Sequence, residues 1–242
     1  MGSLWFRRPS PLRRLWIVQR CRLSPSGRVF TIDALARQGI NLPLTPTQQS
    51  SLQTVGATLP TLIDNQPARA AIGALPPNRA IALGDPNNPA DAVGNASPVF
   101  VRLPGDGFSI GLPRDPEGRS QGVVTYLTPA DNGQRGSRAR PFSPATGNAT
   151  GYDSGHGIPL RAGGPGDIPQ LLLIELRNNN RGSVRSYEDF LADRLSKGAE
   201  IVYTKIPIIL SGNNGDIPDY IVQQAWSPNQ GWALPPVVFQ NY

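Results

Sequence analysis

The sequence predicts an α+β fold for residues 121–242, in which a helix packs against an antiparallel sheet. One stretch, residues 186–195, has the apolar spacing and the end signals of a helix. Four other stretches are short and rich in β-branched and aromatic residues, as strands are. These strand-like stretches are residues 122–127, 200–210, 219–226 and 236–240. Their order is typical of a small α+β domain with a ligand site where the helix meets the sheet.

The first expected strand, residues 122–127, reads Gly-Val-Val-Thr-Tyr-Leu, a composition that favours extended backbone. A polar, basic loop follows and contains Arg135, Arg138 and Arg140. The next segment holds His156, the only histidine of the chain. We expect this segment to form a loop between the first strand and the helix.

The expected helix, residues 186–195, has signals at both ends. Ser186 is the expected N-cap, acidic residues fill the first turn, and Lys197 with Gly198 closes the helix. Its apolar side chains recur every four residues on one face. After the helix, the turn signal Asn213-Asn214-Gly215 separates two of the expected strands, which favours antiparallel pairing.

Upstream of residue 121 the chain is rich in structure-breaking residues. Gly and Pro contribute 26 residues each to the chain, a high share for a globular protein. Many fall within residues 41–120, in runs such as 75–78, 85–89 and 103–107. We therefore expect a Pro/Gly-rich, loosely structured N-terminal region, in which residues 41–120 form a linker or a loosely packed module.

The net charge of +6 is concentrated in residues 1–40, an Arg-rich arm with eight arginines and one acid, Asp33. Residues 41–242 are nearly neutral. Such an arm can bind nucleic acid or anionic lipid, act as a targeting segment, or be a solvated leader. We expect three parts: this arm, the linker or module over residues 41–120, and the domain over residues 121–242.

The composition excludes several kinds of site and segment. A single cysteine, Cys21, excludes internal disulfides and, beside a single histidine, disfavours a structural zinc site. We expect any bound metal to have oxygen ligands. The chain has no apolar run of membrane-spanning length, and residues 15–18 are too few to be the apolar core of a standard Sec signal peptide.

His156, Asn180 and Glu188 form the most informative pattern in the chain. Histidine is the usual general base near neutral pH. An amide oxygen binds a hard cation without neutralising it, and a carboxylate holds the water molecules of that cation. The asparagine and the glutamate are eight residues apart, and the glutamate lies in the expected helix. The set indicates metal-assisted hydrolysis, with Mg²⁺, or another divalent cation such as Mn²⁺, as the cofactor.

Asp153-Ser154-Gly155-His156, the pair Gly163-Gly164, Asn180 and the helical Glu188 together resemble the DNA/RNA non-specific endonuclease family. The uninterrupted spacing from the asparagine to the glutamate is similar to the branch of that family found in bacterial polymorphic toxins. The resemblance covers residues 121–242 and implies a ββα-metal nuclease core.

The resemblance implies a role for each residue. His156 would take a proton from the attacking water, and Asn180 would bind the cation. Glu188 would serve both the metal and the catalysis by accepting hydrogen bonds from metal-bound water molecules. Asp153 would orient the histidine turn, or would only bond to its own backbone in a turn. The glycines on either side of His156 are expected to let the backbone bend sharply.

Each of these residues also has a structural interpretation. A lone histidine such as His156 is often a hydrogen-bonded structural residue. Residues 178–180 suit a polar loop, and Glu188 suits the first turn of any helix because of the helix dipole. Gly163-Gly164 suits either an approach to phosphate or a simple turn. The occurrence of all of them in one order favours the catalytic interpretation.

Two positions depart from the family pattern. Ser154 stands where the wider family has arginine, and Ala192 stands where it has an arginine one helical turn after the glutamate. Another cation must therefore stabilise the phosphate. The candidates are Arg161 for the reacting phosphate and Arg181, Arg185 and Arg140 for substrate binding.

The sequence thus predicts a metal-dependent, sequence-non-specific endonuclease that hydrolyses DNA and RNA. No motif for reading bases occurs in the chain. The toxin-branch resemblance implies delivery by a bacterial secretion system into the cytoplasm of a target cell, and an acidic immunity protein that covers the site in the producer. The alternatives are a non-catalytic nucleic-acid-binding protein with a degenerate core, and a secretion adaptor in which residues 1–120 carry the main role.

Overall fold

A computed structural model of the chain describes residues 44–82, 85–89, 98–139, 151–177, 180–209, 217–234 and 236–241. The predicted Arg-rich arm, Arg140 and the turn signal at residues 213–215 lie outside these ranges.

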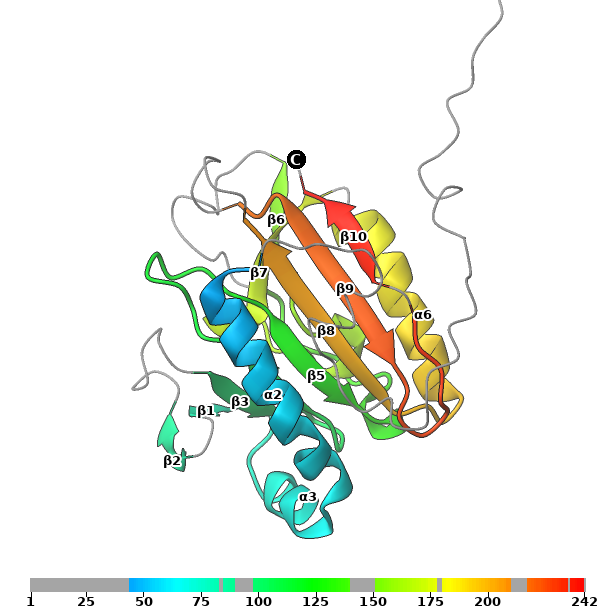
Figure 1. Ribbon diagram of the computed structural model, residues 1–242. Coiled ribbons are helices and arrows are strands. Elements are labelled where there is room, and N and C mark those ends of the chain that lie inside the picture. Colours follow the sequence, from blue (N-terminus) through cyan, green and yellow to red (C-terminus); the bar gives the residue numbers. More distant parts are fainter. Residues whose placement is uncertain are drawn as a thin grey trace, which may run out of the picture.

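Antiparallel pairing joins all the strands, which form two sheets (Figure 1). The larger sheet has eight strands in the order β10-β9-β8-β5-β4-β3-β1-β2, and the smaller one pairs β6 with β7. The strands are β1 (Ala80–Ala82), β2 (Asp85–Pro89), β3 (Val99–Arg102), β4 (Phe108–Gly111), β5 (Val123–Leu127), β6 (Tyr152–His156), β7 (Leu172–Leu176), β8 (Ile201–Ile208), β9 (Tyr220–Trp226) and β10 (Val237–Gln240). Together with the helices, they confirm the predicted α+β class.

The large sheet lies between two layers (Figure 1). Helices α2 (Pro46–Asp64) and α3 (Gln66–Gly73) cover one face, while α6 (Arg185–Ser196) lies on the other, as do β6 and β7. Short 3-10 turns and one π turn connect these elements. They are η2 (Pro129–Asp131), η3 (Leu160–Ala162), η4 (Pro169–Leu171) and the π turn η5 (Asn180–Val184).

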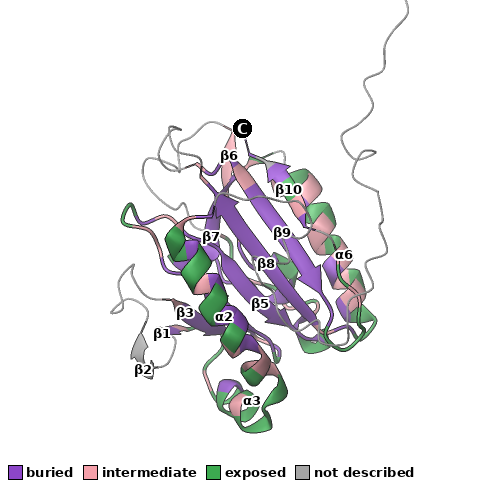
Figure 2. Cartoon of the chain, viewed as in Figure 1, coloured by how far each residue is buried: buried purple, intermediate pink, exposed green. Residues whose placement is uncertain are grey.

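Strand β8 is buried along its whole length because both faces of the sheet are covered (Figure 2). Val202 and Ile206 belong to the core beneath α2, whereas Ile201 and Tyr203 belong to the core beneath α6. The alternation of side chains along a strand produces this division. Lys205 has the same parity as Tyr203 and therefore points towards the layer of α6, β6 and β7.

Helix α2 is fastened to the sheet at its first turn. Thr45 and Gln48 form a capping box, in which each side chain accepts from the backbone amide of the other. The buried Nε2 of Gln48 also donates to the backbone carbonyls of Gln121, at 3.2 Å, and Pro207, at 2.7 Å. This one side chain ties the helix to two segments of the sheet layer.

The prediction of a linker or loosely packed module over residues 41–120 is wrong for the part that the structure describes. Strand β4 pairs directly with β5, with Ile110 opposite Val124, and α2 contributes Leu52 to the core that contains Val124. Strands of four residues joined by Pro/Gly turns have too little local pattern to be recognised, because long-range pairing stabilises them.

Hydrogen bonds stabilise the Pro/Gly-rich turn at residues 103–107. The backbone amide of Leu103 donates to the carbonyl of Gly107 at 2.9 Å. The buried carboxylate of Asp131 accepts from the Gly105 amide at 3.1 Å and from the Thr128 amide at 2.8 Å. One carboxylate therefore closes the β3–β4 turn and caps η2.

The predicted C-terminal elements agree with the structure to within two residues at most ends. Helix α6 begins one residue before and ends one residue after the predicted range, and Gly198 closes it with φ of +82°. Ser186 is not its N-cap. The backbone is already helical through η5, and the Ser186 hydroxyl donates to the Gly182 carbonyl instead. Within the described ranges, no helix has the length and apolarity needed to cross a membrane.

Candidate functional site

The candidate residues lie on a unit of two strands followed by a helix. Strands β6 and β7 pair with Asp153 opposite Glu175 and with His156 opposite Leu172. The π turn η5 and helix α6 follow directly and carry Asn180 and Glu188. His156 is the last residue of β6 rather than part of a loop, so a strand fixes its backbone.

One hydrogen bond defines which nitrogen of His156 is free. The ring Nε2 lies 2.8 Å from the backbone carbonyl oxygen of Ser137. A carbonyl can only accept, so Nε2 carries the hydrogen and the lone pair lies on Nδ1. Burial lowers the pKa of His156 below its ordinary value, the bond to Ser137 opposes this, and the positive charge of Lys205 lowers the pKa further. At neutral pH the ring is therefore an uncharged base.

The loop that presents the Ser137 carbonyl is itself fixed. The Gly166 amide donates to the Ser137 hydroxyl at 2.6 Å, and the Gly136 amide donates to the Leu160 carbonyl at 2.8 Å. Gly136 also packs against Gly164 so closely that a Cβ on Gly136 would overlap the Gly164 backbone. These contacts hold the acceptor of His156 in place.

Gly163 and Gly164 both take part in this close packing. Both glycines are buried. Gly163 has φ of +83°, in the left-handed region that favours glycine, and it ends η3. A Cβ on Gly164 would overlap the Ile158 carbonyl. This packing and the left-handed conformation of Gly163 are what the simple-turn interpretation of the pair requires.

The glycines beside His156 are both required for space. Gly155 lies within strand β6, where a Cβ would overlap the carboxylate of Glu175. A Cβ on Gly157 would lie 2.8 Å from the Leu171 carbonyl oxygen. Neither glycine is among those with positive φ. The chain does bend at Gly157, directly after His156, whereas Gly155 lies within the strand, so the expected bend occurs on one side of the histidine.

Asp153 contacts the asparagine loop rather than the histidine. Its carboxylate accepts from Asn180 Nδ2 at 3.4 Å, from Arg181 Nε at 2.9 Å and from Arg177 Nε at 3.1 Å. Partial burial would raise the pKa of Asp153, but the hydrogen bonds from Arg181 and Arg177 lower it below its ordinary value. These contacts of Asp153 orient the side chain of Asn180, and none of them involves the histidine turn.

The amide of Asn180 is turned so that its oxygen is available. Its nitrogen Nδ2 donates to the carboxylate of Asp153, and within the described residues no donor contacts the oxygen Oδ1. Residues eight apart in an α-helix are offset by about 80° around the axis. The wider π turn at residues 180–184 reduces this offset. Asn180 and Glu188 are thus brought towards one side of the helix.

Glu188 is a half-buried carboxylate whose pKa is raised to about 7. Burial is the main cause, the charge of Lys205 opposes it, and the neighbouring Glu175 adds to it. Within the part of the chain that the structure describes, no cation forms an ion pair with Glu188. A carboxylate in this state gains from a cation placed beside it.

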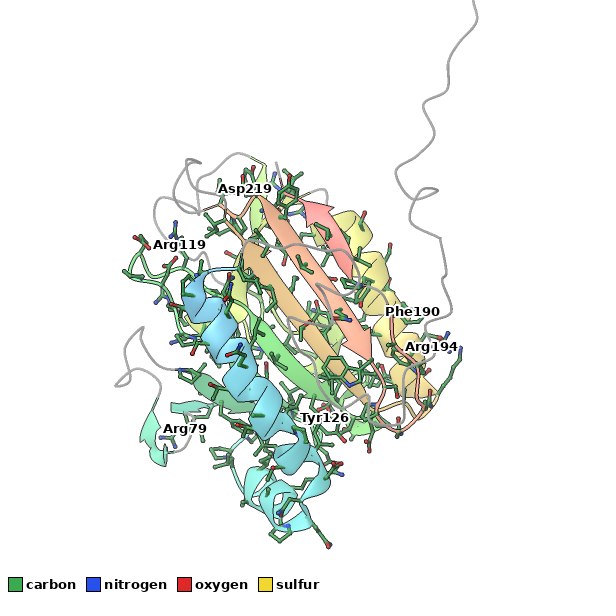
Figure 3. All side chains as sticks on the ribbon, in the orientation of Figure 1. Arg79, Arg119, Tyr126, Phe190, Arg194 and Asp219 are labelled. Atoms are coloured by element: carbon green, nitrogen blue, oxygen red, sulfur yellow. The ribbon has the colours of Figure 1, made fainter. Side chains whose placement is uncertain are left out.

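Two contacts hold α6, and with it Glu188, against the sheet. At the first turn, the Tyr187 ring lies 6.1 Å from the ring of the buried Tyr203 on β8. Further along, Phe190 meets Trp232 edge to face at 6.2 Å, and the Arg194 guanidinium lies 4.9 Å from the Phe190 ring centroid (Figure 3 labels Phe190 and Arg194). Aromatic packing therefore holds the first turn of the helix against Tyr203 and its middle against Trp232.

The candidate arginines are placed differently from one another. Arg161 forms an ion pair with Asp189 at 2.8 Å, and its charge also lowers the pKa of Glu188. Arg181 is bound by Asp153, and Arg185 is exposed at the start of α6. Arg177, which was not singled out from the sequence, joins Arg181 on the same carboxylate.

A buried ion pair that was not predicted from the sequence lies beneath the histidine. Glu175 on β7 and Lys205 on β8 are both 0% exposed and contact each other, and Lys205 Nζ donates to the backbone carbonyl of His156 at 2.8 Å. Each is a lone charge inside an otherwise apolar strand, Leu172–Leu176 or Ile201–Ile208. That interruption is the signal that could have revealed them.

The described residues contain no group of three or more His, Cys, Asp or Glu side chains placed to hold a metal. The oxygens that fit a hard cation here are Asn180 Oδ1 and the carboxylate of Glu188. The amide oxygen would bind such a cation directly, and the carboxylate would accept hydrogen bonds from its water molecules.

Comparisons with known proteins found similar solved structures but no family. No protein-family model matches the chain, and no curated protein matches it. NucA from Streptococcus agalactiae with magnesium bound is 13% identical with a TM-score of 0.42, over 53% of this chain and 70% of that chain. NucA from the same organism with no metal bound is 13% identical with a TM-score of 0.40, over 75% of this chain and 92% of that chain. We therefore infer the function from the residues of this chain.

Proposed function

We propose that the chain is a divalent-metal-dependent, sequence-non-specific endonuclease with a ββα-metal core formed by β6, β7 and α6. The observation that carries this proposal is the state of His156, which is uncharged and has a free lone pair on Nδ1 because Nε2 donates to Ser137. The order of Asp153, His156, Asn180 and Glu188, and its resemblance to the DNA/RNA non-specific endonucleases, supports the same proposal.

His156 acts as the general base of the hydrolysis. Nδ1 accepts a proton from a water molecule as the water oxygen bonds to phosphorus and the bond to the 3′ oxygen breaks. The ring does not need to rotate, since Ser137 already holds Nε2. The lowered pKa of His156 keeps the ring unprotonated, and so able to accept, at neutral pH.

Asn180 and Glu188 are the residues that would hold the divalent cation, Mg²⁺ or Mn²⁺. Asn180 would provide the oxygen Oδ1, and Glu188 would accept hydrogen bonds from the water molecules of the cation. When bound, the cation supplies positive charge to phosphate oxygens and to the leaving oxygen. Asp153 supports the site by holding the amide of Asn180 in one orientation.

Arginines around the site would bind the phosphates of DNA and RNA. Arg161 is the candidate for the reacting phosphate because it lies near enough to Glu188 to affect the pKa of that carboxylate. Arg181 and Arg185, on η5 and at the start of α6, suit neighbouring phosphates. Contacts with phosphate carry no sequence information, which agrees with a non-specific enzyme.

Cleavage of supercoiled plasmid and of structured RNA tests the proposal. With Mg²⁺ or Mn²⁺ the wild-type chain is expected to nick both, and EDTA to stop the reaction. His156→Ala is expected to lower the rate by about 10²–10⁴, while Lys197→Ala, at an exposed lysine, leaves it unchanged. A wild-type chain without cleavage, or a His156→Ala chain with full activity, would refute the mechanism.

We further propose a biological role as a toxin effector that acts in the cytoplasm of a target cell after delivery by a bacterial secretion system. An acidic immunity protein would protect the producer by covering the site. This role is supported by the sequence resemblance to the polymorphic-toxin branch. Expression inside a bacterial cell is expected to reduce colony numbers, and His156→Ala to restore them. Equal survival with the two chains would refute the toxin role.

A second candidate function is non-catalytic binding of nucleic acid by a degenerate core. Ala192 favours it, because the related enzymes have an arginine one turn after the glutamate and this chain has none there. Under this alternative, filter binding of single-stranded DNA would persist without cleavage. Cleavage that depends on His156 would exclude it.

A further inference from the structure

We infer that Lys205 is a positioning residue for His156 and that Glu175 holds Lys205 in that task. The ammonium group of Lys205 contacts the Glu175 carboxylate and, at 2.8 Å, the backbone carbonyl of His156. The catalytic consequence of this inference rests on the proposed function, but the placement of the ring can be measured without it.

The burial of Lys205 makes the contact unusual. The chain has two lysines, and the other one, Lys197, is exposed and pairs with Asp193 one helical turn away. Lys205 and Glu175 are both 0% exposed. Transfer of two charges from water into the interior has a large desolvation cost, which their mutual attraction offsets only when the geometry is good.

Lys205 also connects two parts of the fold that backbone pairing does not join. It extends from β8 in the large sheet, whereas Glu175 and His156 belong to the small sheet of β6 and β7. Its side chain therefore crosses between the two sheets and ends at the last residue of β6. A shift of the small sheet would break both contacts of the ammonium group at once.

The two contacts of His156 lie at opposite ends of the residue. Ser137 holds the ring through Nε2, and Lys205 holds the backbone through the carbonyl oxygen. With both ends fixed, the rotation of the ring is restricted and Nδ1 keeps one direction. Gly155 lets β6 pack closely against Glu175, since a Cβ on residue 155 would overlap the Glu175 side chain.

Stability alone does not account for a pair of this kind. Replacement of a buried ion pair by apolar side chains of similar volume is often neutral or stabilising. Within the described residues, Lys205 is the side chain that donates to the His156 carbonyl. Replacement of Lys205 and Glu175 by apolar residues would therefore remove the hydrogen bond that holds the backbone of His156.

The test uses the full chain, purified without a polyhistidine tag so that His156 stays the single imidazole, and labelled with [¹⁵N]histidine. The variant combines Lys205→Met with Glu175→Leu. It removes both charges together, so that no unpaired charge is left in the protein interior. The matched control is Lys197→Met, which removes the exposed lysine. NMR reports the tautomer of the ring, and plasmid cleavage reports kcat and KM.

We expect the wild type and Lys197→Met to show one fixed tautomer with the hydrogen on Nε2. The double variant is expected to fold, to show averaged ring tautomers, and to lose about 100-fold in kcat with KM within about twofold. A folded double variant with the imidazole signals of the wild type would overturn the inference. So would a double variant that does not fold, because the pair would then be a requirement of the fold itself.

The two proposals fail in distinguishable ways. If the wild type does not cleave nucleic acid, the proposed function fails, and the imidazole signals still decide whether Lys205 positions the ring. If the wild type cleaves and the folded double variant cleaves equally well with a fixed tautomer, the enzyme assignment stands and the positioning role is excluded.

Discussion

The side-chain nitrogen of Asn180 donates to the carboxylate of Asp153 at 3.4 Å, and this contact sets which end of the amide faces outward. Nitrogen and oxygen of an amide differ completely as metal ligands, since only the oxygen carries a lone pair for the cation. The role of Asp153 is thus indirect, through the orientation of its neighbour. The two arginines on the same carboxylate, Arg177 and Arg181, keep it ionised by lowering its pKa.

Asp153→Asn is expected to weaken activation by Mg²⁺ about tenfold or more, as loss of a group that orients a metal ligand usually does. The reason is that an amide at residue 153 no longer selects the nitrogen end of Asn180. Titration of plasmid cleavage with Mg²⁺ measures the effect. Asp193→Asn, at an exposed pair with Lys197, is the control. Unchanged Mg²⁺ dependence in Asp153→Asn would contradict the role of Asp153.

Glu188 is expected to make the stability of the metal-free protein fall between pH values of about 4.5 and 7. Its folded-state pKa of about 7 lies above the ordinary value of 4.5, so the folded protein holds a proton that the unfolded chain has lost. The stabilisation is complete below pH 4.5 and is lost as the pH rises through 7. Urea unfolding in EDTA at a series of pH values measures it, against Glu188→Gln as the comparison. A Glu188→Gln variant with the same pH dependence as the wild type would exclude this assignment.

The acid side of the pH–rate profile is expected to follow His156. Its pKa lies below the ordinary value of 6.5, first because of burial and also because of the charge of Lys205. Activity at saturating Mg²⁺ should therefore be level near pH 7 and fall only below pH 6.5. Chemical-shift titration of the single imidazole gives the pKa independently. An inflection above pH 6.5 in both measurements would be inconsistent with the buried, neutral base.

Local signals explain which parts of the fold could be predicted from the sequence. Helix α6 has an apolar face and a closing glycine within its own residues, so its range was found to within one residue at each end. The strands β3 and β4 have no such pattern, because their stability comes from pairing with β5 and from the cover of α2. A stretch rich in Pro and Gly therefore has the sequence pattern of a linker, although its described part supplies strands of the sheet and the helices that cover it.

The candidate site was predictable only where residue type alone carries the chemistry. His156, Asn180 and Glu188 could be proposed because a base, an amide oxygen and a carboxylate occur in the order and spacing that resemble the endonuclease family. The contacts of Glu175 and Lys205 depend on the register of β6 with β7 and on the packing of one sheet over another. No spacing along the chain indicates those relationships.

Gly155→Ala is expected to destabilise the protein by about 1–3 kcal/mol, as overpacking of a filled interior does. The added methyl group would overlap the side chain of Glu175, and a shift of that side chain would disturb its buried contact with Lys205. Gly182→Ala is the matched control, since open space surrounds Gly182 and alanine favours helical backbone. Urea unfolding of both variants measures the difference. Equal stability of the two would show that the β6–β7 interface has room that the packing around Gly155 does not indicate.

Removal of residues 1–120 is expected to prevent folding of the remainder, even though the candidate residues all lie after residue 120. The truncation deletes β4 and so leaves the buried strand β5 as a sheet edge with unpaired backbone groups. It also removes α2, which covers the apolar face that includes Val124 and Val202. A chain that starts at residue 44 keeps both elements and is expected to unfold in one cooperative transition. Circular dichroism and urea unfolding compare the two truncations. Cooperative unfolding of the shorter one would show that the sheet does not need its first strands, and it would restore a domain boundary near residue 121.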